Sequence, residues 1–156
     1  VAFGKKAQVC GFIATDRIED VKENVFHVSS RINSTWGGNL VDMIRCQRYL
    51  EIMAEENLVE NAAARGAELL AGLESLVKEF PEHVMNARGK GLMCAFDLRD
   101  GQLRDKITAK AYEEGVVVLG CGSQSIRFRP SLVISKAEIA GGLEKFRTSI
   151  KKAIAK

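Results

Sequence analysis

Several features that mark common classes of protein are missing from this sequence of 156 residues. No apolar run approaches the roughly 18 residues that a membrane-spanning helix needs, and no layout typical of a secretory signal peptide is present. Basic and acidic residues are intermixed and give a formal net charge of +3, whereas nucleic-acid-binding proteins usually gather basic residues into a stripe. We therefore expect neither membrane nor nucleic acid among the partners.

The close spacing of cysteines and histidines that is typical of metal sites is also missing. The four cysteines lie far apart, none of them forms a C-x-x-C pair, and the two histidines stand alone. A structural zinc site needs such ligands in close groups, so we expect no metal. Scattered cysteines without a disulfide framework are typical of the reducing cytoplasm, where we expect the protein to be found.

The first residue is Val1 rather than methionine, and residues 1–4 form an apolar, strand-like run that ends on Lys5 and Lys6. This opening predicts a piece of a longer protein, cut just before a lysine at the mouth of a buried strand. The length accommodates one modest domain, or a small domain together with an arm of another.

The spacing of apolar residues predicts a series of helices and short strands. A capping-box pattern at Asp16 would open a short helix that carries Ile18, Val21 and Val25 inward. The other expected helices begin after an N-cap at Asn39, run over about 58–80 and 102–114, and begin again at a capping box over 135–138. The expected strands are 84–87, 92–98, 116–119 and 125–128, with a turn over 88–91 and a break over 120–122.

This order of elements predicts an α/β fold of the α+β kind, with helices packed on one face of a short sheet. Short hairpin strands mixed with helices argue against a full doubly wound sheet. We expect three parts, namely an arm over 1–38, a connecting helix over 39–56, and a small domain over 57–156.

Lys5 is the first candidate for chemistry. It follows a glycine at the end of the apolar run, where partial desolvation would favour the free amine, which is a nucleophile toward an aldehyde. The alternative is an ordinary solvated lysine at a strand end, which is where most lysines lie.

The second candidate is the loop Ser34-Thr35-Trp36-Gly37-Gly38-Asn39. Its hydroxyls, its glycines and the helix start that follows are suited to holding a phosphate. The alternative is an ordinary capped helix start with Trp36 in the core.

The third candidate is Arg127, which lies on a short strand between apolar neighbours and shares a face with Arg129. An arginine held on a rigid strand is suited to bidentate capture of a carboxylate. A surface ion pair is the alternative.

In this order, four segments resemble the C-terminal part of the class III, pyridoxal-phosphate-dependent aminotransferases of fold type I. The segments that carry the resemblance are 3–11, 33–40, 88–96 and 126–130. Lys6 stands where ornithine-type members have alanine, and Trp36 replaces a common tyrosine. Both departures favour the branch of the family that acts on the ε-amino group of L-lysine.

The resemblance implies a role for each matching residue. Lys5 would be the Schiff-base lysine and would bind the cofactor, pyridoxal 5'-phosphate. Thr35 would donate to the cofactor phosphate of the neighbouring subunit, which implies a homodimer, and Ser34 would lie near that phosphate. Arg127 would bind a substrate carboxylate, and Asn33 would lie near the substrate.

The implied activity of the full-length protein is transfer of the ε-amino group of L-lysine to 2-oxoglutarate, giving glutamate and 2-aminoadipate semialdehyde. The resemblance also implies that this chain alone is inactive, because the groups that hold the cofactor ring would precede Val1. Two alternatives remain open, namely an ω-aminotransferase acting on ornithine or 4-aminobutyrate, and a non-catalytic dimerisation or interaction domain.

Overall fold

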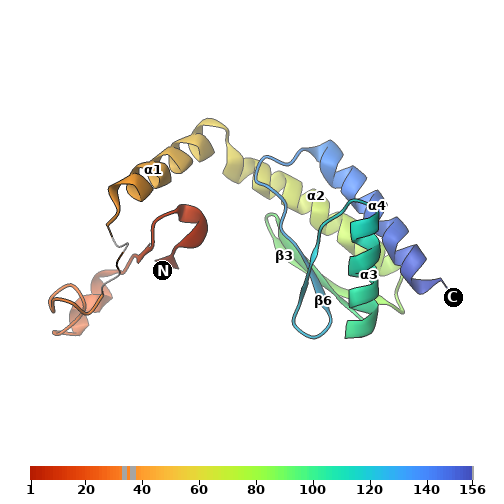
Figure 1. The fold of residues 1–156 in the computed structure, drawn as a ribbon, viewed down its shortest axis with the longest axis horizontal. Helices are drawn as coiled ribbons and strands as arrows, with labels where there is room; N and C mark the ends of the chain where they lie inside the picture. The colour runs from red at the N-terminus through yellow and green to blue at the C-terminus, as the bar shows by residue number, and fades with distance from the viewer. Residues whose placement is uncertain (33–34, 36–37, 156) are drawn as a thin grey trace. The chain divides into compact units, whose positions relative to one another are not determined.

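The computed structural model describes residues 1–32, 35 and 38–155, so positions 33, 34, 36, 37 and 156 lie outside the description. The described chain divides into two compact units, Val1–Glu56 and Asn57–Lys156 (Figure 1). The finer division of the first unit into an arm over 1–38 and a connecting helix over 39–56 stays a prediction.

The described residues of the first unit form two short strands and three helices. Strand β1 (Ala2–Phe3) pairs with β2 (Gly11–Phe12) in antiparallel fashion, with Ala2 opposite Phe12. The 3-10 helices η1 (Lys5–Ala7) and η2 (Asp16–Asp20) follow β1 and β2, and α1 (Leu40–Glu55) completes the unit.

One expectation for this unit is wrong, and another is confirmed only in part. The strand before Lys5 is exposed rather than buried, because β1 has only two residues and only the equally short β2 beside it. The helix expected at Asp16 is one short 3-10 helix whose N-cap, Thr15, makes no side-chain hydrogen bond, and Val21 is exposed. Without a cap and without an apolar surface to cover, the pattern at Asp16 does not extend into an α-helix.

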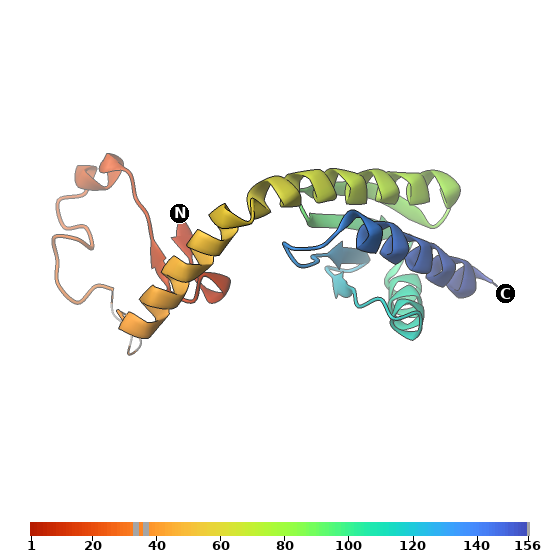
Figure 2. The same ribbon diagram turned by 90° about the horizontal axis from the view of Figure 1, so that it is seen from above.

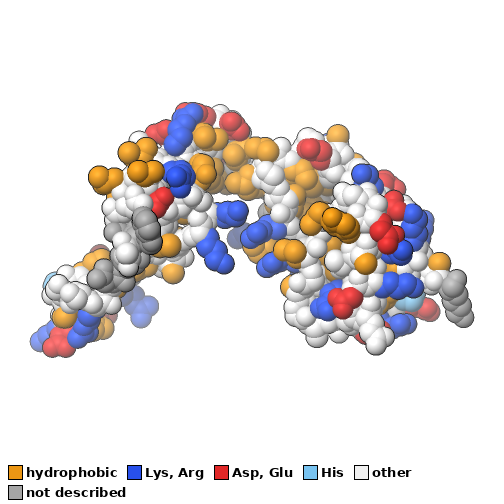
Figure 3. Space-filling view, in the orientation of Figure 1, with side chains coloured by type: hydrophobic (Ala, Val, Ile, Leu, Met, Phe, Trp, Pro, Cys, Tyr) orange, Lys and Arg blue, Asp and Glu red, His pale blue; other side chains and the backbone are white. Residues whose placement is uncertain are grey.

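Helix α1 begins where the sequence predicts. The side chain of Asn39 accepts a hydrogen bond from the backbone N–H of Val41 at 3.0 Å, which satisfies one of the free donors at the helix start. No residue of α1 is buried, and Leu40 and Ile44 are among its exposed apolar side chains. Hydrophobic side chains accordingly lie at the surface in this part of Figure 3.

The second unit consists of a four-stranded antiparallel sheet and three helices. Its elements in chain order are α2 (Leu58–Glu79), β3 (Val84–Lys90), β4 (Met93–Leu98), α3 (Gly101–Glu113), β5 (Leu119–Cys121), β6 (Ser125–Phe128) and α4 (Lys136–Ile154). The strands are ordered β3-β4-β6-β5, so that α3 connects a central strand to an edge strand. Helices α2 and α4 run side by side (Figures 1 and 2).

The core of this unit lies between the helices and one face of the sheet. Alternate residues of β4 and β6 point into it, including Phe96 and Phe128, and Phe146 of α4 meets them. The three ring centroids lie 5.1–5.7 Å apart, a spacing at which aromatic rings attract one another. The expected fold class, a short sheet with helices on one face, is confirmed.

Helix ends in this unit follow the sequence signals. In α4, the Ser135 hydroxyl accepts from the backbone N–H of Glu138, and the Glu138 carboxylate accepts from the backbone N–H of Ser135, which is the predicted capping box. Helix α2 ends at Glu79, two residues before Pro81, as expected.

Two strand predictions need correction. Residues 88–90 continue β3 instead of forming a turn, because the strand bulges at Asn86 and the chain turns later, at Gly91. Residues 116–118 precede β5, which instead includes Gly120 and Cys121. In the described part of the chain, no helix is both long enough and apolar enough to cross a membrane.

Candidate functional site

Lys5 lies in the tight turn after β1. Its φ of 48° is in the left-handed region, and Gln8 closes the turn with a φ of 64°. Such conformations are costly for residues with a Cβ and persist where surrounding contacts impose them. The side chain is exposed, and its amine makes no hydrogen bond or ion pair with any described residue. The Lys5 amine is therefore free to react, although desolvation by a buried strand is not present.

Gln8 connects this turn to helix α1. Its backbone N–H donates to the carbonyl of Lys5 at 2.9 Å, and its side-chain amide donates to the same carbonyl at 3.3 Å. Its Oε1 accepts from Arg45 of α1 at 3.0 Å, and Arg45 also contacts Asp42 at 3.1 Å. Gln8 thus holds the carbonyl of Lys5, and Arg45 of α1 holds Gln8 in turn, while the Lys5 amine has no such partner among the described residues.

Of the predicted phosphate loop, the structure describes Thr35, Gly38 and Asn39, and Thr35 is exposed and lies in a turn. Its hydroxyl has no hydrogen-bond partner among the described residues. Asn33 and Ser34, predicted near the substrate and the phosphate, lie outside the described residues, and so does Trp36. Their roles stay predictions.

Arg127 lies at the centre of β6, with Ala95 opposite it on one side and Leu119 on the other. Its neighbours Ile126 and Phe128 are buried in the core, so Arg127 projects from the outer face of the sheet, away from the helices. Its Nε is buried without a hydrogen-bond partner, and no carboxylate in the described part of the chain pairs with it. The ion-pair alternative is therefore not realised with any described residue.

Sequence reasoning missed a polar cluster beside Arg127 on the same face, which we call the Asp97 cluster: Asn86, Arg88, Asp97 and Ser125. The carboxylate of Asp97 accepts hydrogen bonds from Asn86 at 2.7 Å, from Arg88 at 2.9 Å and from Ser125 at 2.5 Å. The side chain of Asp97 is 14% exposed, so these bonds are partly shielded from water. Its donors come from two different strands, β3 and β6. Their spacing along the sequence therefore does not predict the cluster.

The pKa of Asp97 reflects this arrangement. Partial burial raises the pKa of the carboxyl, but the hydrogen bonds from Ser125, Asn86 and Arg88, together with the Arg88 charge, outweigh burial and lower the pKa below its ordinary value. At neutral pH the carboxylate is therefore ionised and neutralises Arg88.

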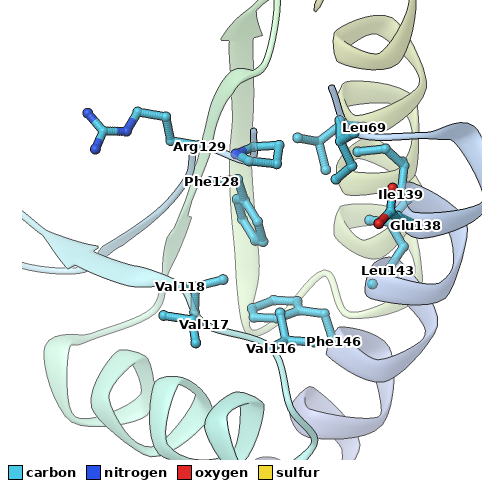
Figure 4. A pocket seen from close by; sticks show the side chains of 13 residues that line it. Leu69, Val116, Val117, Val118, Phe128, Arg129, Glu138, Ile139, Leu143 and Phe146 are labelled. Atoms are coloured by element: carbon cyan, nitrogen blue, oxygen red, sulfur yellow. The ribbon is translucent and has the colours of Figure 1, made fainter. Parts of the chain in front are cut away.

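The second unit also contains an apolar cavity of about 150 Å³ between β6, α4 and residues 116–118 (Figure 4). Phe128, Phe146 and Leu143 line it, and the side chain of Arg129 points away from it. With so few polar groups it is suited to no charged substrate, and Arg127 is not among its lining residues.

Comparison with known proteins assigns the class. Residues 1–150 match the aminotransferase class-III family, so the chain belongs to the class-III aminotransferases. Members of this family use pyridoxal phosphate as cofactor.

Individual relatives are similar over nearly the whole chain. It is 48% identical over 151 residues to the L-lysine-epsilon aminotransferase of Amycolatopsis lactamdurans, covering 96% of this chain and 34% of that protein. It superposes with a TM-score of 0.90 and 45% identity on the lysine aminotransferase from M. tuberculosis in the internal aldimine form, covering 97% of this chain and 35% of that one. The human mitochondrial 4-aminobutyrate aminotransferase is 37% identical over 133 residues, which are 85% of this chain and 25% of that protein. The chain thus spans about a third of the length of the lysine aminotransferases that it matches.

The described residues fit part of the cofactor. The exposed amine of Lys5 is suited to condense with an aldehyde, and the hydroxyl of Thr35, which has no hydrogen-bond partner among the described residues, can donate to a phosphate.

Proposed function

We propose that the full-length protein containing this chain transfers the ε-amino group of L-lysine to 2-oxoglutarate. The carbon that loses the amino group becomes the aldehyde of 2-aminoadipate semialdehyde, and the keto carbon of 2-oxoglutarate becomes the amino-bearing carbon of glutamate. The identity of 48% to a lysine aminotransferase, against 37% to a 4-aminobutyrate aminotransferase, supports lysine as the donor.

Lys5 performs the covalent and proton-transfer work in this proposal. When bound, pyridoxal phosphate supplies an aldehyde that carries the amino group and a ring that accepts electrons from the substrate carbon. The Nζ of Lys5 would hold the cofactor by condensing with that aldehyde, with release of water, and once displaced by the substrate amine it would accept and return the proton at the ε-carbon of lysine. The hydrogen bonds of Gln8 to the Lys5 carbonyl hold the backbone while the side chain moves.

Arg127 is the proposed binding site for the substrate carboxylate. A guanidinium with a buried, unpartnered Nε on a rigid strand is a donor that lacks its acceptor, and a carboxylate matches its planar geometry. In this proposal Arg127 binds the α-carboxylate of lysine in one half-reaction and a carboxylate of 2-oxoglutarate in the other. Both substrates possess such a group, so one arginine serves both halves.

The remaining residues complete the proposed site. Thr35 donates its hydroxyl to the cofactor phosphate of the neighbouring subunit, which makes the active form a homodimer. The family resemblance assigns Ser34 to the same phosphate and Asn33 to the substrate, and both assignments are part of the proposal.

The experiment is a substrate panel on the full-length enzyme. L-Lysine, L-ornithine and 4-aminobutyrate are supplied as separate donors with 2-oxoglutarate, and glutamate formation is measured together with the aldehyde product. We expect kcat/KM for lysine to exceed both others by at least tenfold. Preference for ornithine or 4-aminobutyrate would reassign the substrate within the family, and absence of glutamate with every donor would favour the non-catalytic module.

The chain of 156 residues alone is proposed to be inactive. Incubation with pyridoxal phosphate followed by borohydride and mass spectrometry tests this proposal directly. We expect no stoichiometric adduct at Lys5 and no lysine-dependent glutamate. A stoichiometric adduct with turnover would contradict it.

A further inference from the structure

Two arginines share one row across the outer face of the sheet. Arg88 of β3 and Arg127 of β6 both lie opposite Ala95 of β4, one on each side of it. Directly opposed residues project from the same face, and two strand spacings separate their Cα atoms by roughly 10 Å. Ala95 between them has a small side chain, and Arg88 extends over β4 far enough to approach the Ser125 hydroxyl of β6 at 3.4 Å.

The two arginines differ in their partners. Arg88 donates to Asp97 at 2.9 Å and to the backbone carbonyl of Asn86 at 2.8 Å, and it approaches the Ser125 hydroxyl at 3.4 Å. The carbonyl of Asn86 is in reach because Asn86 has a φ of 55° at the β-bulge. Arg127 has no carboxylate partner among the described residues, and its Nε is unsatisfied.

We propose that Asp97 is a specificity-determining residue, which keeps Arg88 occupied so that Arg127 rather than Arg88 receives a substrate carboxylate. A free Arg88 would offer a second guanidinium within reach of the same dicarboxylate. A substrate such as 2-oxoglutarate could then bridge the two arginines or bind Arg88 in the wrong position. This inference rests on the proposed function, because Arg127 is the proposed carboxylate site.

The substitution Asp97→Asn tests the proposal, because it removes the negative charge while keeping the size of the side chain. The probe is glutarate, a dicarboxylate without the reacting keto group, and its affinity for the full-length enzyme is measured by titration calorimetry. We expect glutarate to bind about tenfold more tightly to Asp97→Asn than to the wild type. The double variant Asp97→Asn with Arg88→Gln should return to wild-type affinity.

Two controls separate this role from a structural one. Arg88→Gln alone should leave glutarate affinity unchanged, because Arg88 is already occupied in the wild type, and this variant does not depend on whether Asp97→Asn folds. Asp105→Asn, which breaks the ion pair with Arg104 at 2.8 Å on α3, should also leave affinity unchanged. If Arg88→Gln weakens binding, or if the gain in Asp97→Asn survives removal of Arg88, the proposal is wrong.

Kinetics give a second readout. Non-productive binding lowers kcat and KM together and leaves kcat/KM unchanged, so we expect both constants for 2-oxoglutarate to fall about tenfold in Asp97→Asn. A raised KM that Arg88→Gln does not reverse would indicate mere disruption and overturn the proposal. If the wild type catalyses no transamination, the proposed function fails, but the glutarate affinities still decide the role of Asp97.

Discussion

Gly66 of α2 lies against the backbone of Gly91, so closely that a Cβ on Gly66 would fall 2.2 Å from the Gly91 carbonyl oxygen. Gly91 occupies the turn between β3 and β4 with a φ of 54°, a conformation that glycine adopts without cost. Two glycines thus fix the distance between the first helix of the small domain and its first hairpin. Since neither partner is a flexible side chain, the contact leaves no room for adjustment.

Gly66→Ala should therefore destabilise the second unit. Forcing α2 away from the hairpin costs on the order of 1–3 kcal/mol, more than the gain of about 1 kcal/mol in helix propensity. Urea denaturation followed by circular dichroism measures the difference. Gly141→Ala in α4, where a Cβ would meet nothing within 4 Å, is the matched control and should stabilise the chain slightly. Equal effects at both positions would contradict this reasoning.

The Asp97 cluster predicts a dependence of stability on pH. Because the folded-state pKa of Asp97 is lowered, its contribution is fully present above the carboxyl's unfolded pKa and is lost as pH falls through the folded value. Asp97→Asn should cost about 1–3 kcal/mol at pH 7, since charge-assisted hydrogen bonds are lost. The difference between variant and wild type should shrink steadily in acid. A difference in unfolding free energy that stays constant from pH 7 to pH 2 would rule this account out.

Lys5 and its neighbour Lys6 offer a matched pair. In the full-length enzyme, Lys5→Ala should abolish the borohydride-trapped cofactor adduct and lower kcat by at least a thousandfold, because both nucleophile and proton carrier are removed. Lys6→Ala removes the same positive charge as Lys5→Ala but leaves the Lys5 amine in place, so this variant should retain the adduct. Absorbance of the bound cofactor and peptide mass mapping report both results. An adduct mapped to Lys6 would move the assignment by one residue.

Arg127 and Arg129 form a second pair. Arg127→Gln should lower kcat/KM for 2-oxoglutarate about a hundredfold, on the order of 3 kcal/mol, because the substrate carboxylate loses a charged partner. Arg129 is exposed and follows the end of β6, so Arg129→Gln should change kcat/KM less than threefold. Steady-state kinetics with lysine and 2-oxoglutarate distinguish them. Similar losses in both variants would indicate general electrostatic attraction rather than a specific site.

Helices α2 and α4 were predictable because local signals determine them. An apolar stripe of period 3.6 and a proline stop define α2, and reciprocal hydrogen bonds between Ser135 and Glu138 define the start of α4. Strand β6 was equally clear, since Ile126 and Phe128 alternate with polar neighbours. Each of these signals lies within the element that it defines.

Elements that depend on distant partners were not predictable. The run of valines at 116–118 resembles a strand, but the backbone N–H of Val116 donates to the carbonyl of Ala111 at 2.8 Å and so completes the end of α3. The strand begins only at Leu119, where β6 supplies its partner. The Asp97 cluster escaped sequence reasoning for the same reason, because its members meet only when three strands pair.

The absence of any buried residue in α1 has a thermal consequence. In the described part of the first unit, Asn24 alone is buried, whereas the second unit encloses a continuous apolar core. Cooperative melting arises from the simultaneous loss of many packed contacts, and a helix held chiefly by its own hydrogen bonds frays progressively instead. On heating, the chain should therefore lose its order in two regimes, with a gradual loss over the segment that carries Lys5 and one sharp transition over the sheet that carries Arg127.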